Sequence, residues 1–139
     1  MREVIEKLRH QGVEAVAIVF LHGYRNPVHE QRAARLISEL APQMTVATSF
    51  ESSPEIREFE RTSTTVLNAL LRPVISGYLE RVTGRLKSAG IGAPLYLVQS
   101  NGEVASPAEA ARSPARLLLS GPAGGAMAMA ALALSLIHI

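Results

Sequence analysis

The sequence predicts an α/β fold in which the strands of a mostly parallel sheet alternate with helices. Three observations carry this prediction. Residues 15–21 form an unbroken apolar run rich in Val and Ile, Asn26-Pro27 opens a helical pattern, and a second, longer helical pattern follows from residue 56. An uninterrupted apolar run is typical of a strand that is buried on both faces, as in a parallel sheet.

The first half of the chain is expected to form a helix, a strand, a second helix and a second strand, in that order. Residues 4–10 predict a short helix that ends near Gly12, and residues 15–21 predict a central parallel strand. The next helix spans about residues 27–40, with Asn26 as its cap and Pro27 at its first position. Pro42 ends this helix, and residues 44–48 are a short strand candidate. The apolar side chains of the helix recur at helical spacing, at Ala33, Leu36, Ile37 and Leu40.

A long helix is the strongest single prediction. Ser52 or Ser53 can cap it, and Pro54 fits its first turn. The helix could extend to residue 89, where Gly90 follows, with a kink or break at Pro73 because a proline ring clashes with the preceding turn. Its apolar side chains recur every three or four residues, at Ile56, Phe59, Val66, Leu70, Val74 and Tyr78.

The last third of the chain is expected to contain short elements. Residues 95–98 predict a strand, and Ser106-Pro107 followed by Glu109 predicts a capped short helix through Arg112. Residues 117–119 predict another strand. Residues 120–125 predict a tight glycine-rich loop, and a helix is expected from residue 126 onward.

Composition excludes several classes of function. The chain has 139 residues, 47% hydrophobic and 19% charged, with a net charge of +2, which indicates a globular chain. The basic residues are spread along the sequence, so we expect no nucleic-acid partner. Cysteine is absent, which removes disulfides and thiolate chemistry. All 12 acidic residues are Glu, although phosphoryl-transfer sites commonly hold magnesium through Asp.

Neither end of the chain carries a membrane or export signal. The N-terminal residues alternate charged with apolar groups, unlike a signal peptide. The uninterrupted apolar tail, residues 126–139, has 14 residues, whereas a spanning helix needs roughly 20. We therefore expect a cytoplasmic protein with no membrane partner. An all-apolar helix needs cover on every side, so we expect the chain to be a fragment cut at both ends, and residues 135–139 resemble read-through of foreign sequence.

The sequence Ser-Gly-Pro-Ala-Gly-Gly at residues 120–125 is the first candidate site. Glycines allow a backbone to approach a ligand closely, and the start of a helix can hold a phosphate through its free amides. The sequence lacks the Gly-Lys-Ser/Thr of a Walker A loop and the Gly-x-Gly-x-x-Gly spacing. A turn that packs a helix against a sheet is the alternative. The candidate phosphate-binding residues are Ser120, Gly121, Ala123, Gly124 and Gly125.

The run of four hydroxyl residues after Arg61 is the second candidate site. Ser and Thr compete for backbone hydrogen bonds and are poor helix interior, so the run indicates a local constraint. The Arg61 guanidinium could bind a carboxylate, an oxyanion or a phosphate. The alternative, which the pattern favours, is a helix junction in which Arg61 pairs with a nearby Glu. The residues that could line a substrate cleft here are Arg61, Thr62, Ser63 and Thr64.

Two further features are weaker. Ser100 and Asn101 follow a predicted strand and could bind a polar ligand, although Asn-Gly is also a common turn. His22, His29 and Glu30 could supply metal ligands, but their spacing is not an established zinc pattern. We therefore assign no metal ligands, and interpret His22 as a strand-end residue and His29 as part of a first helical turn. His10 and His138 lie in no pattern that indicates a functional site.

Several segments together resemble the hydantoinase A / 5-oxoprolinase family. They are residues 12–17, Leu-His-Gly-Tyr-Arg-Asn-Pro at 21–27, the segment 55–69 with Glu-Arg-Thr-Ser-Thr-Thr, Val-Gln-Ser-Asn-Gly at 98–102, and Leu-Ser-Gly-Pro-Ala-Gly-Gly at 119–125. These segments occur in the family's order and spacing and cover nearly all of the chain up to about residue 133.

The resemblance implies a partial actin-like ATPase fold, with two lobes that close over a nucleotide. It implies that the parent protein uses ATP and Mg²⁺ to open cyclic amides such as hydantoins or 5-oxoproline. A phosphoryl group would be transferred to the amide oxygen before water attacks the carbon. Related members carboxylate ketones instead, and many members act with a hydantoinase B-type subunit. A non-catalytic actin-like nucleotide-binding module is a further alternative.

By the same resemblance, residues 1–54 belong to the end of the first lobe, 55–92 to a long connecting helix region, and 93–139 to the start of the second lobe with its glycine-rich phosphate loop. The chain also departs from the family pattern. It lacks the Asp-x-Gly-Gly-Thr phosphate loop and the second Asp-containing glycine loop, in agreement with its lack of Asp. We therefore expect the fragment to be inactive alone, and the resemblance assigns no catalytic residues.

Overall fold

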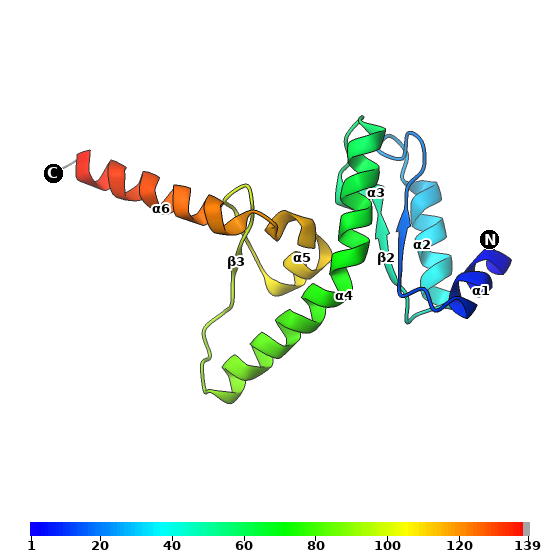
Figure 1. Ribbon diagram of the computed structural model, residues 1–139, viewed down its shortest axis with the longest axis horizontal. Helices are drawn as coiled ribbons and strands as arrows, with labels where there is room; N and C mark the ends of the chain where they lie inside the picture. The colour runs from blue at the N-terminus through cyan, green and yellow to red at the C-terminus, as the bar shows by residue number, and fades with distance from the viewer. Residues whose placement is uncertain (138–139) are drawn as a thin grey trace. The chain divides into compact units, whose positions relative to one another are not determined.

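The chain folds as helices interspersed with short strands, in the element order shown in Figure 1. The structure is a computed structural model that describes residues 1–137. It divides into two compact units, Met1–Val74 and Ile75–Ile139. The long helix α4, Glu58–Ser88, contributes to both units, and the fold class is α/β.

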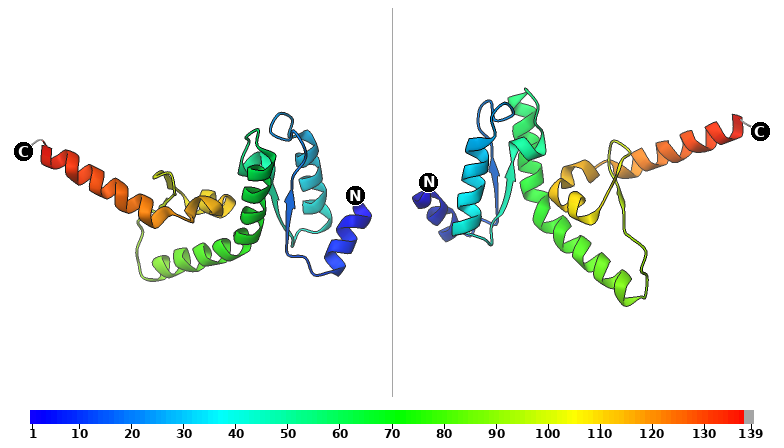
Figure 2. Two further views of the ribbon diagram at one scale, coloured as in Figure 1. Left: turned by 45° about the horizontal axis from the view of Figure 1, so that its top comes forward. Right: turned by 180° about the vertical axis from the view of Figure 1, so that it is seen from behind.

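Unit 1 is built around two parallel strands. Strand β1 (Ala15–Ile18) pairs with β2 (Thr45–Thr48), and Ile18 lies opposite Thr48 at the last pair. Helix α2 (Val28–Leu40) lies on one side of these strands and the first half of α4 on the other (Figure 2). Helix α1 (Arg2–His10) packs beside α2. The core of unit 1 is formed by Ile5, Ile18, Ala33, Ile37, Ala41 and Met44.

The predicted parallel strand at residues 15–21 is confirmed but shorter than expected. It ends at Ile18, because the next backbone amides bind side chains instead of a strand: Phe20 N donates to Glu30. Ala15 to Ala17 are half-buried, and only Ile18 is buried, so the expected burial on both faces is not found in the described residues. Helix α2 is confirmed within a residue of its predicted start. Its cap position is Pro27, while Asn26 Oδ1 accepts from Val28 N at 3.2 Å.

The predicted start of the long helix is wrong. Residues Ser49–Ser52 form a separate short helix, α3, whose cap is Thr48, with Oγ1 accepting from Glu51 N at 3.4 Å. Ser52 therefore lies inside α3, Ser53 follows it, and α4 begins at Glu58. The helix is continuous through Pro73, so of the predicted kink or break, the break is not found there.

The apolar positions predicted for α4 are exposed in the described residues, at Phe59, Val66, Leu70, Val74 and Tyr78. The face of α4 that unit 1 buries is mostly polar, because it carries Arg61, Thr65 and Asn68 with Ala69. The helical period was therefore predictable, whereas the buried face was not.

Unit 2 is smaller and contains a short hairpin. Strands β3 (Leu97–Val98) and β4 (Val104–Ala105) are antiparallel, and β3 is shorter than predicted. Helix α5 (Pro107–Arg112) is confirmed with its capping box: Ser106 Oγ accepts from Glu109 N at 3.3 Å, and Glu109 Oε2 accepts from Ser106 N at 2.8 Å. Leu79, Ala105 and Ala110 are the buried centre of this unit.

The predicted strand at residues 117–119 and the tight loop at 120–125 are both wrong. Residues Pro114–Leu117 form a 3₁₀ helix, η1, and a turn leads directly into helix α6 (Ser120–Ile137). Ser100 Oγ accepts from Leu119 N at 3.2 Å, which fixes the backbone as a turn where a strand was expected. In residues 1–137, no helix is both long and apolar enough to cross a membrane. His138 and the last residue of the 135–139 tail lie outside the described residues.

Candidate functional site

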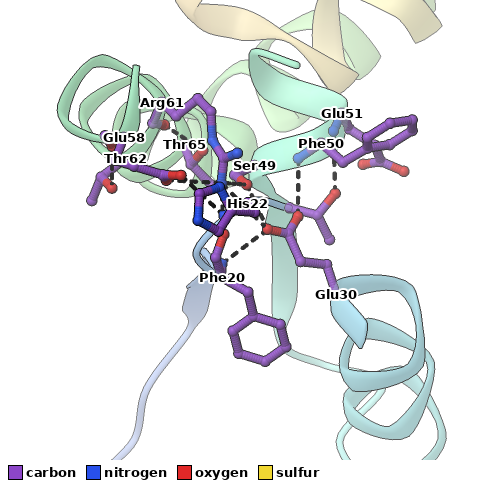
Figure 3. Close-up of polar contacts among 11 residues, drawn as sticks. Phe20, His22, Glu30, Ser49, Phe50, Glu51, Glu58, Arg61, Thr62 and Thr65 are labelled. Atoms are coloured by element: carbon purple, nitrogen blue, oxygen red, sulfur yellow. Dashed lines mark hydrogen bonds and ion pairs between the residues drawn. The ribbon is translucent and has the colours of Figure 1, made fainter. Parts of the chain in front are cut away.

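A buried carboxylate joins the ends of the two parallel strands in unit 1. Glu30, on α2, is fully buried and accepts three hydrogen bonds: from Phe20 N at 3.0 Å, Phe50 N at 2.9 Å and Ser49 Oγ at 2.5 Å (Figure 3). Phe20 lies just beyond β1, and Ser49 and Phe50 just beyond β2. A buried carboxylate is tolerated only when such partners replace water.

A buried guanidinium completes this strand-end cluster, which consists of Phe20, Glu30, Ser49, Glu58 and Arg61. Arg61, on α4, is fully buried. Its Nη2 donates to Phe20 O at 2.8 Å and to Ser49 Oγ at 2.9 Å, and lies 3.3 Å from Glu58 Oε2 and 3.9 Å from Glu30 Oε1. The pairing of Arg61 with a nearby Glu, which the sequence pattern favoured, is therefore present in the structure.

Two donors of Arg61 are not used by the described residues. Nε and Nη1 are buried without a hydrogen-bond partner among residues 1–137. The guanidinium carbon lies 5.4 Å from the centre of the Tyr24 ring, within the range of a cation–π contact. Buried donors without partners are rare in folded proteins and call for an explanation.

The segment after β1 has an unusual backbone at His22, whose φ is 57°, in the left-handed region. His22 N donates to Glu58 Oε1 at 3.0 Å, and its ring meets the Tyr24 ring edge-on at 6.1 Å. The next residue, Gly23, is buried, and a Cβ there would meet Glu30 Oε1 and lie 3.0 Å from Phe20 O. Only glycine fits here while Glu30 keeps its place.

The hydroxyl run bonds mainly to its own helix. Thr62 Oγ1 donates to Glu58 O at 2.7 Å, and Thr65 Oγ1 to Arg61 O at 2.6 Å. Bonds of this kind, four residues back, are the usual way in which a helix accommodates Ser and Thr. Thr62 and Ser63 are exposed and Thr64 is half-buried, so these three predicted residues are not gathered around the Arg61 guanidinium.

In unit 2, the predicted residues Ser100 and Asn101 lie in the turn between β3 and β4. Ser100 N and Oγ both donate to Arg116 O, at 2.6 and 2.7 Å. Asn101 Oδ1 accepts from Glu103 N at 3.0 Å. Gly102 has φ 85°, and a Cβ there would collide with Met127 of α6. The Asn-Gly pair therefore forms a turn that packs against the first turns of α6.

The predicted phosphate-binding residues form the start of α6 and lie beside this turn. Three of them are glycines inside a helix, yet little surrounds them. A Cβ at Gly121 or Gly125 would meet no heavy atom within 4 Å, and one at Gly124 would make an ordinary contact of 3.7 Å with Val98. The first amides of a helix have no partners within it; here Pro122 has no N–H and Ala123 N donates to Leu119 O at 3.2 Å, which leaves those of Ser120 and Gly121.

No group of three or more His, Cys, Asp or Glu side chains that could hold a metal ion occurs in residues 1–137. His22 and His29 therefore do not come together with further ligands in this part of the chain. Glu30, which was grouped with them as a weak metal candidate, instead lies at the centre of the strand-end cluster.

The sequence reasoning missed Glu30, Ser49 and Gly23 as site residues. One signal for Glu30 was available. It precedes the buried Ala33 and Ile37 by three and seven residues, so it lies on the apolar face of α2. A carboxylate on an apolar face must be buried with partners or excluded. Ser49 carried no comparable signal.

Comparisons with known proteins identify the class of this chain. It matches the Hydantoinase/oxoprolinase family over residues 61–137 and the N-terminal region of that family over residues 1–41. The chain belongs to the hydantoinase/oxoprolinase family.

Three proteins illustrate the similarity. Caprolactamase subunit alpha of Pseudomonas jessenii is 40% identical over 124 residues, which cover 89% of this chain and 18% of that protein. The crystal structure of the ATP-dependent caprolactamase superposes with a TM-score of 0.81, at 40% identity over 87% of this chain and 18% of that one. The 5-oxoprolinase of Saccharomyces cerevisiae is 33% identical over 125 residues, 90% of this chain and 9% of that protein. A nucleotide-free structure of acetone carboxylase superposes with a TM-score of 0.77, at 25% identity over 97% of this chain and 19% of that one. The chain thus spans about a fifth or less of the length of these proteins.

Proposed function

We propose that this chain is part of an ATP-dependent enzyme that opens cyclic amides of the hydantoin or 5-oxoproline type. Membership of the hydantoinase/oxoprolinase family supports this proposal, and so does the 40% identity to a caprolactamase, whose name denotes action on a cyclic amide. A subunit of an ATP-dependent ketone carboxylase is the second candidate, favoured by the TM-score of 0.77 with acetone carboxylase.

The observation that carries the proposal is the set of glycines at the start of α6. Glycine in a helix costs about 1 kcal/mol relative to alanine, and no packing in residues 1–137 requires Gly121 or Gly125. Three glycines in six residues therefore keep the helix surface bare for a group that approaches it from outside. Together with the first two amides of the helix, those of Ser120 and Gly121, this surface suits a phosphate of a nucleotide.

In this proposal the residues at the start of α6 bind and orient phosphate oxygens. The candidates are Ser120, through its hydroxyl and amide, Gly121 and Ala123 along the first turn, and Gly124 and Gly125 as the bare surface. When bound, ATP would supply the phosphoryl group that, transferred to the amide oxygen, activates the amide carbon toward water. The described residues do not fit a magnesium site, because they include no group of three or more His, Cys, Asp or Glu side chains and the chain has no Asp.

The lobes assigned to residues 1–54, 55–92 and 93–139 are part of the proposal. The proposal also includes a partner subunit of the hydantoinase B type. It is supported by the caprolactamase relative, which is named as the alpha subunit of its enzyme. The strand-end cluster joins the first of these lobes to the start of the connecting helix region, and the nucleotide proposal does not use it.

The test uses the full-length protein that contains this chain. Gly125→Val should weaken ATP binding at least about tenfold, because a branched side chain blocks close approach of the phosphate. Gly84→Val is the matched control, since Gly84 also lies in a helix with open space around it and far along the sequence from α6. Calorimetric titration measures the ATP affinity of the two variants and of the unchanged protein. If the two variants lose the same affinity for ATP, the glycines at the start of α6 do not belong to the nucleotide site.

A second measurement separates the two enzyme candidates. Release of ADP that depends on hydantoin, 5-oxoproline or caprolactam supports the amide hydrolase. Release that depends on a ketone together with bicarbonate supports the carboxylase. ATP binding without either dependence would leave a nucleotide-binding module as the function.

A further inference from the structure

We infer that the imidazole of His22 donates a hydrogen bond to an oxygen acceptor of the small-molecule substrate, and that Arg61 is the residue that positions it. This inference rests on the proposed function for the identity of the substrate. It concerns unit 1 alone and assigns a role to the segment between β1 and α2, which the nucleotide proposal does not use.

The location of His22 is the first argument. Strands β1 and β2 are parallel and end at the same edge, with Ile18 opposite Thr48. Ligands of α/β proteins bind beyond the carboxyl ends of parallel strands, where the connecting segments meet. His22 lies in the segment that follows β1, four residues past the last paired residue.

The backbone of His22 is the second argument. A φ of 57° is uncommon for residues other than glycine, and Asn, Asp and His are the side chains most often found there. The turn is defined by the main chain, since His22 N donates to Glu58, and His22 O accepts from Arg25 N at 3.0 Å and from Asn26 N at 3.3 Å. Glycine would form the same turn without strain. The imidazole is therefore not required by the turn, and strain of this kind concentrates at functional sites.

The exposure of the side chain is the third argument. His22 is exposed, and its ring rests edge-on against Tyr24, whose ring in turn faces the Arg61 guanidinium (Figure 3 shows His22 beside Arg61). The neighbouring Leu21 is 80% exposed. An exposed imidazole on a rigid base can meet a ligand without first becoming ordered, which lowers the entropy cost of binding.

Arg61 supplies that rigid base. It fixes Phe20 O on one side of His22 and pairs with Glu58, whose other oxygen accepts from His22 N. Arg61 and Glu30 are fully buried, and the hydrogen bonds of Arg61 join α4 to the residues just beyond β1 and β2. Removal of Arg61 would release both anchors of the His22 turn, whereas Glu30 and Ser49 would still hold the strand ends.

The experiment compares His22→Gly, Arg61→Lys and the double variant in the full-length protein, with His29→Asn as the control. His29 is exposed on the first turn of α2 and lies outside the cluster. The readouts are kcat and KM for the cyclic amide, the affinity for ATP, the thermal midpoint, and the affinity for caprolactam alone by calorimetry.

We expect His22→Gly to lower kcat/KM for the amide at least about tenfold, with ATP affinity unchanged and a thermal midpoint that is equal or higher. Arg61→Lys should lower kcat/KM as well, and the double variant should lose no more than the larger single loss, because both act through the same contact. His29→Asn should match the unchanged protein in every readout.

An unchanged kcat/KM in His22→Gly overturns the inference, and so do additive losses in the double variant. A loss of thermal midpoint in His22→Gly without a kinetic change also overturns it, because the segment would then pack against another part of the full-length chain. If caprolactam binds to the unchanged protein but is not turned over, the proposed function fails. The inference is then decided by the caprolactam affinity of His22→Gly, which should be lower than that of the unchanged protein. If caprolactam does not bind to the unchanged protein, both fail.

Discussion

Glu30 shows how one side chain can organise the edge of a small sheet. The carboxylate bonds to Phe20 and to Ser49 and Phe50, which follow different strands, and it lies 3.9 Å from the Arg61 guanidinium. Because all of these partners are protein groups, the cost of taking the charge out of water is offset within the cluster. The carboxylate therefore serves as a structural link, while the nearby His22 side chain is exposed.

Glu30→Gln should lower the free energy of unfolding of unit 1 by about 3 kcal/mol, because it leaves the buried Arg61 with one carboxylate fewer and replaces an acceptor oxygen with a donor. Urea unfolding measures the difference. Glu39→Gln is the control, because Glu39 is exposed on the same helix. Equal unfolding midpoints for the two variants would show that the Glu30 bonds contribute little.

At this scale the sequence allowed one of the five cluster residues, Arg61, to be predicted. Arg61 stood out because it precedes four hydroxyl residues, and its pairing with a Glu was foreseen. The positive φ of His22 could not be predicted, because it accompanies the bond from His22 N to the Glu58 carboxylate as well as the bonds that His22 O accepts from Arg25 N and Asn26 N. Such bonds depend on how α4 packs beside β1, and a local pattern contains no information about that.

Among the elements, α5 is the one whose ends were predicted from chemistry alone. Its capping box satisfies two backbone amides that the helix itself leaves free. The hydrogen bonds from the Ser106 backbone and side chain, with a contribution from Arg112, hold the pKa of Glu109 below its ordinary value of 4.5. A carboxyl group with a lowered folded-state pKa stabilises the fold above its unfolded-state pKa, and that contribution is lost as the pH falls through the folded-state value.

Ser106→Ala should lower the thermal midpoint by about 4 °C at neutral pH, through loss of the cap. The difference from the unchanged protein should shrink as the pH falls below 4.5, because protonated Glu109 no longer contributes to the box in either protein. Thermal melts from pH 7 to pH 3 measure this, with the exposed Ser63→Ala as the control. If the difference in thermal midpoint between Ser106→Ala and the unchanged protein grows toward acid pH, the role given to Glu109 in the capping box is contradicted.

The errors among the elements have a common origin. Residues 117–119 are three leucines, and a short apolar run cannot be assigned to strand or helix from its period alone. Residues 120–125 were predicted as a loop because glycine and proline usually interrupt helices, yet a proline near a helix start is well tolerated. The α4 pattern predicted a helix correctly, but its apolar face is not the face that unit 1 buries.

For the whole molecule, the α/β class followed from the alternation of apolar runs and helical patterns. The division at Val74 could not be predicted, because it falls inside α4, where the helical pattern continues without interruption. The exposed apolar side chains are the clearest property of the complete chain. In α6 alone, Met127, Met129, Leu132 and Leu134 are each more than half exposed in the described residues.

The isolated chain of 139 residues should associate in solution and should show no sustained magnesium-dependent ATP hydrolysis. Exposed apolar surface of this extent drives association, and the chain has no Asp with which to hold the metal. Light scattering and phosphate release measure the two properties. Replacement of Met129 and Leu132 by serine should raise the monomer fraction, whereas replacement of the exposed Ser38 and Ser63 by alanine should not. A monomer with steady turnover would contradict both expectations.

The position of Glu30 has a consequence for misfolding. Two strands of four residues each specify their alignment weakly, and a slip by one residue would turn every side chain to the opposite face. Glu30 lies on the helix that connects these strands, and it binds an amide just beyond each of them. In a slipped pairing one amide moves out of reach, and the carboxylate is left buried without its partner. The crossover helix thus favours the observed alignment over a slipped one, because only the observed alignment satisfies both amide bonds of its buried carboxylate.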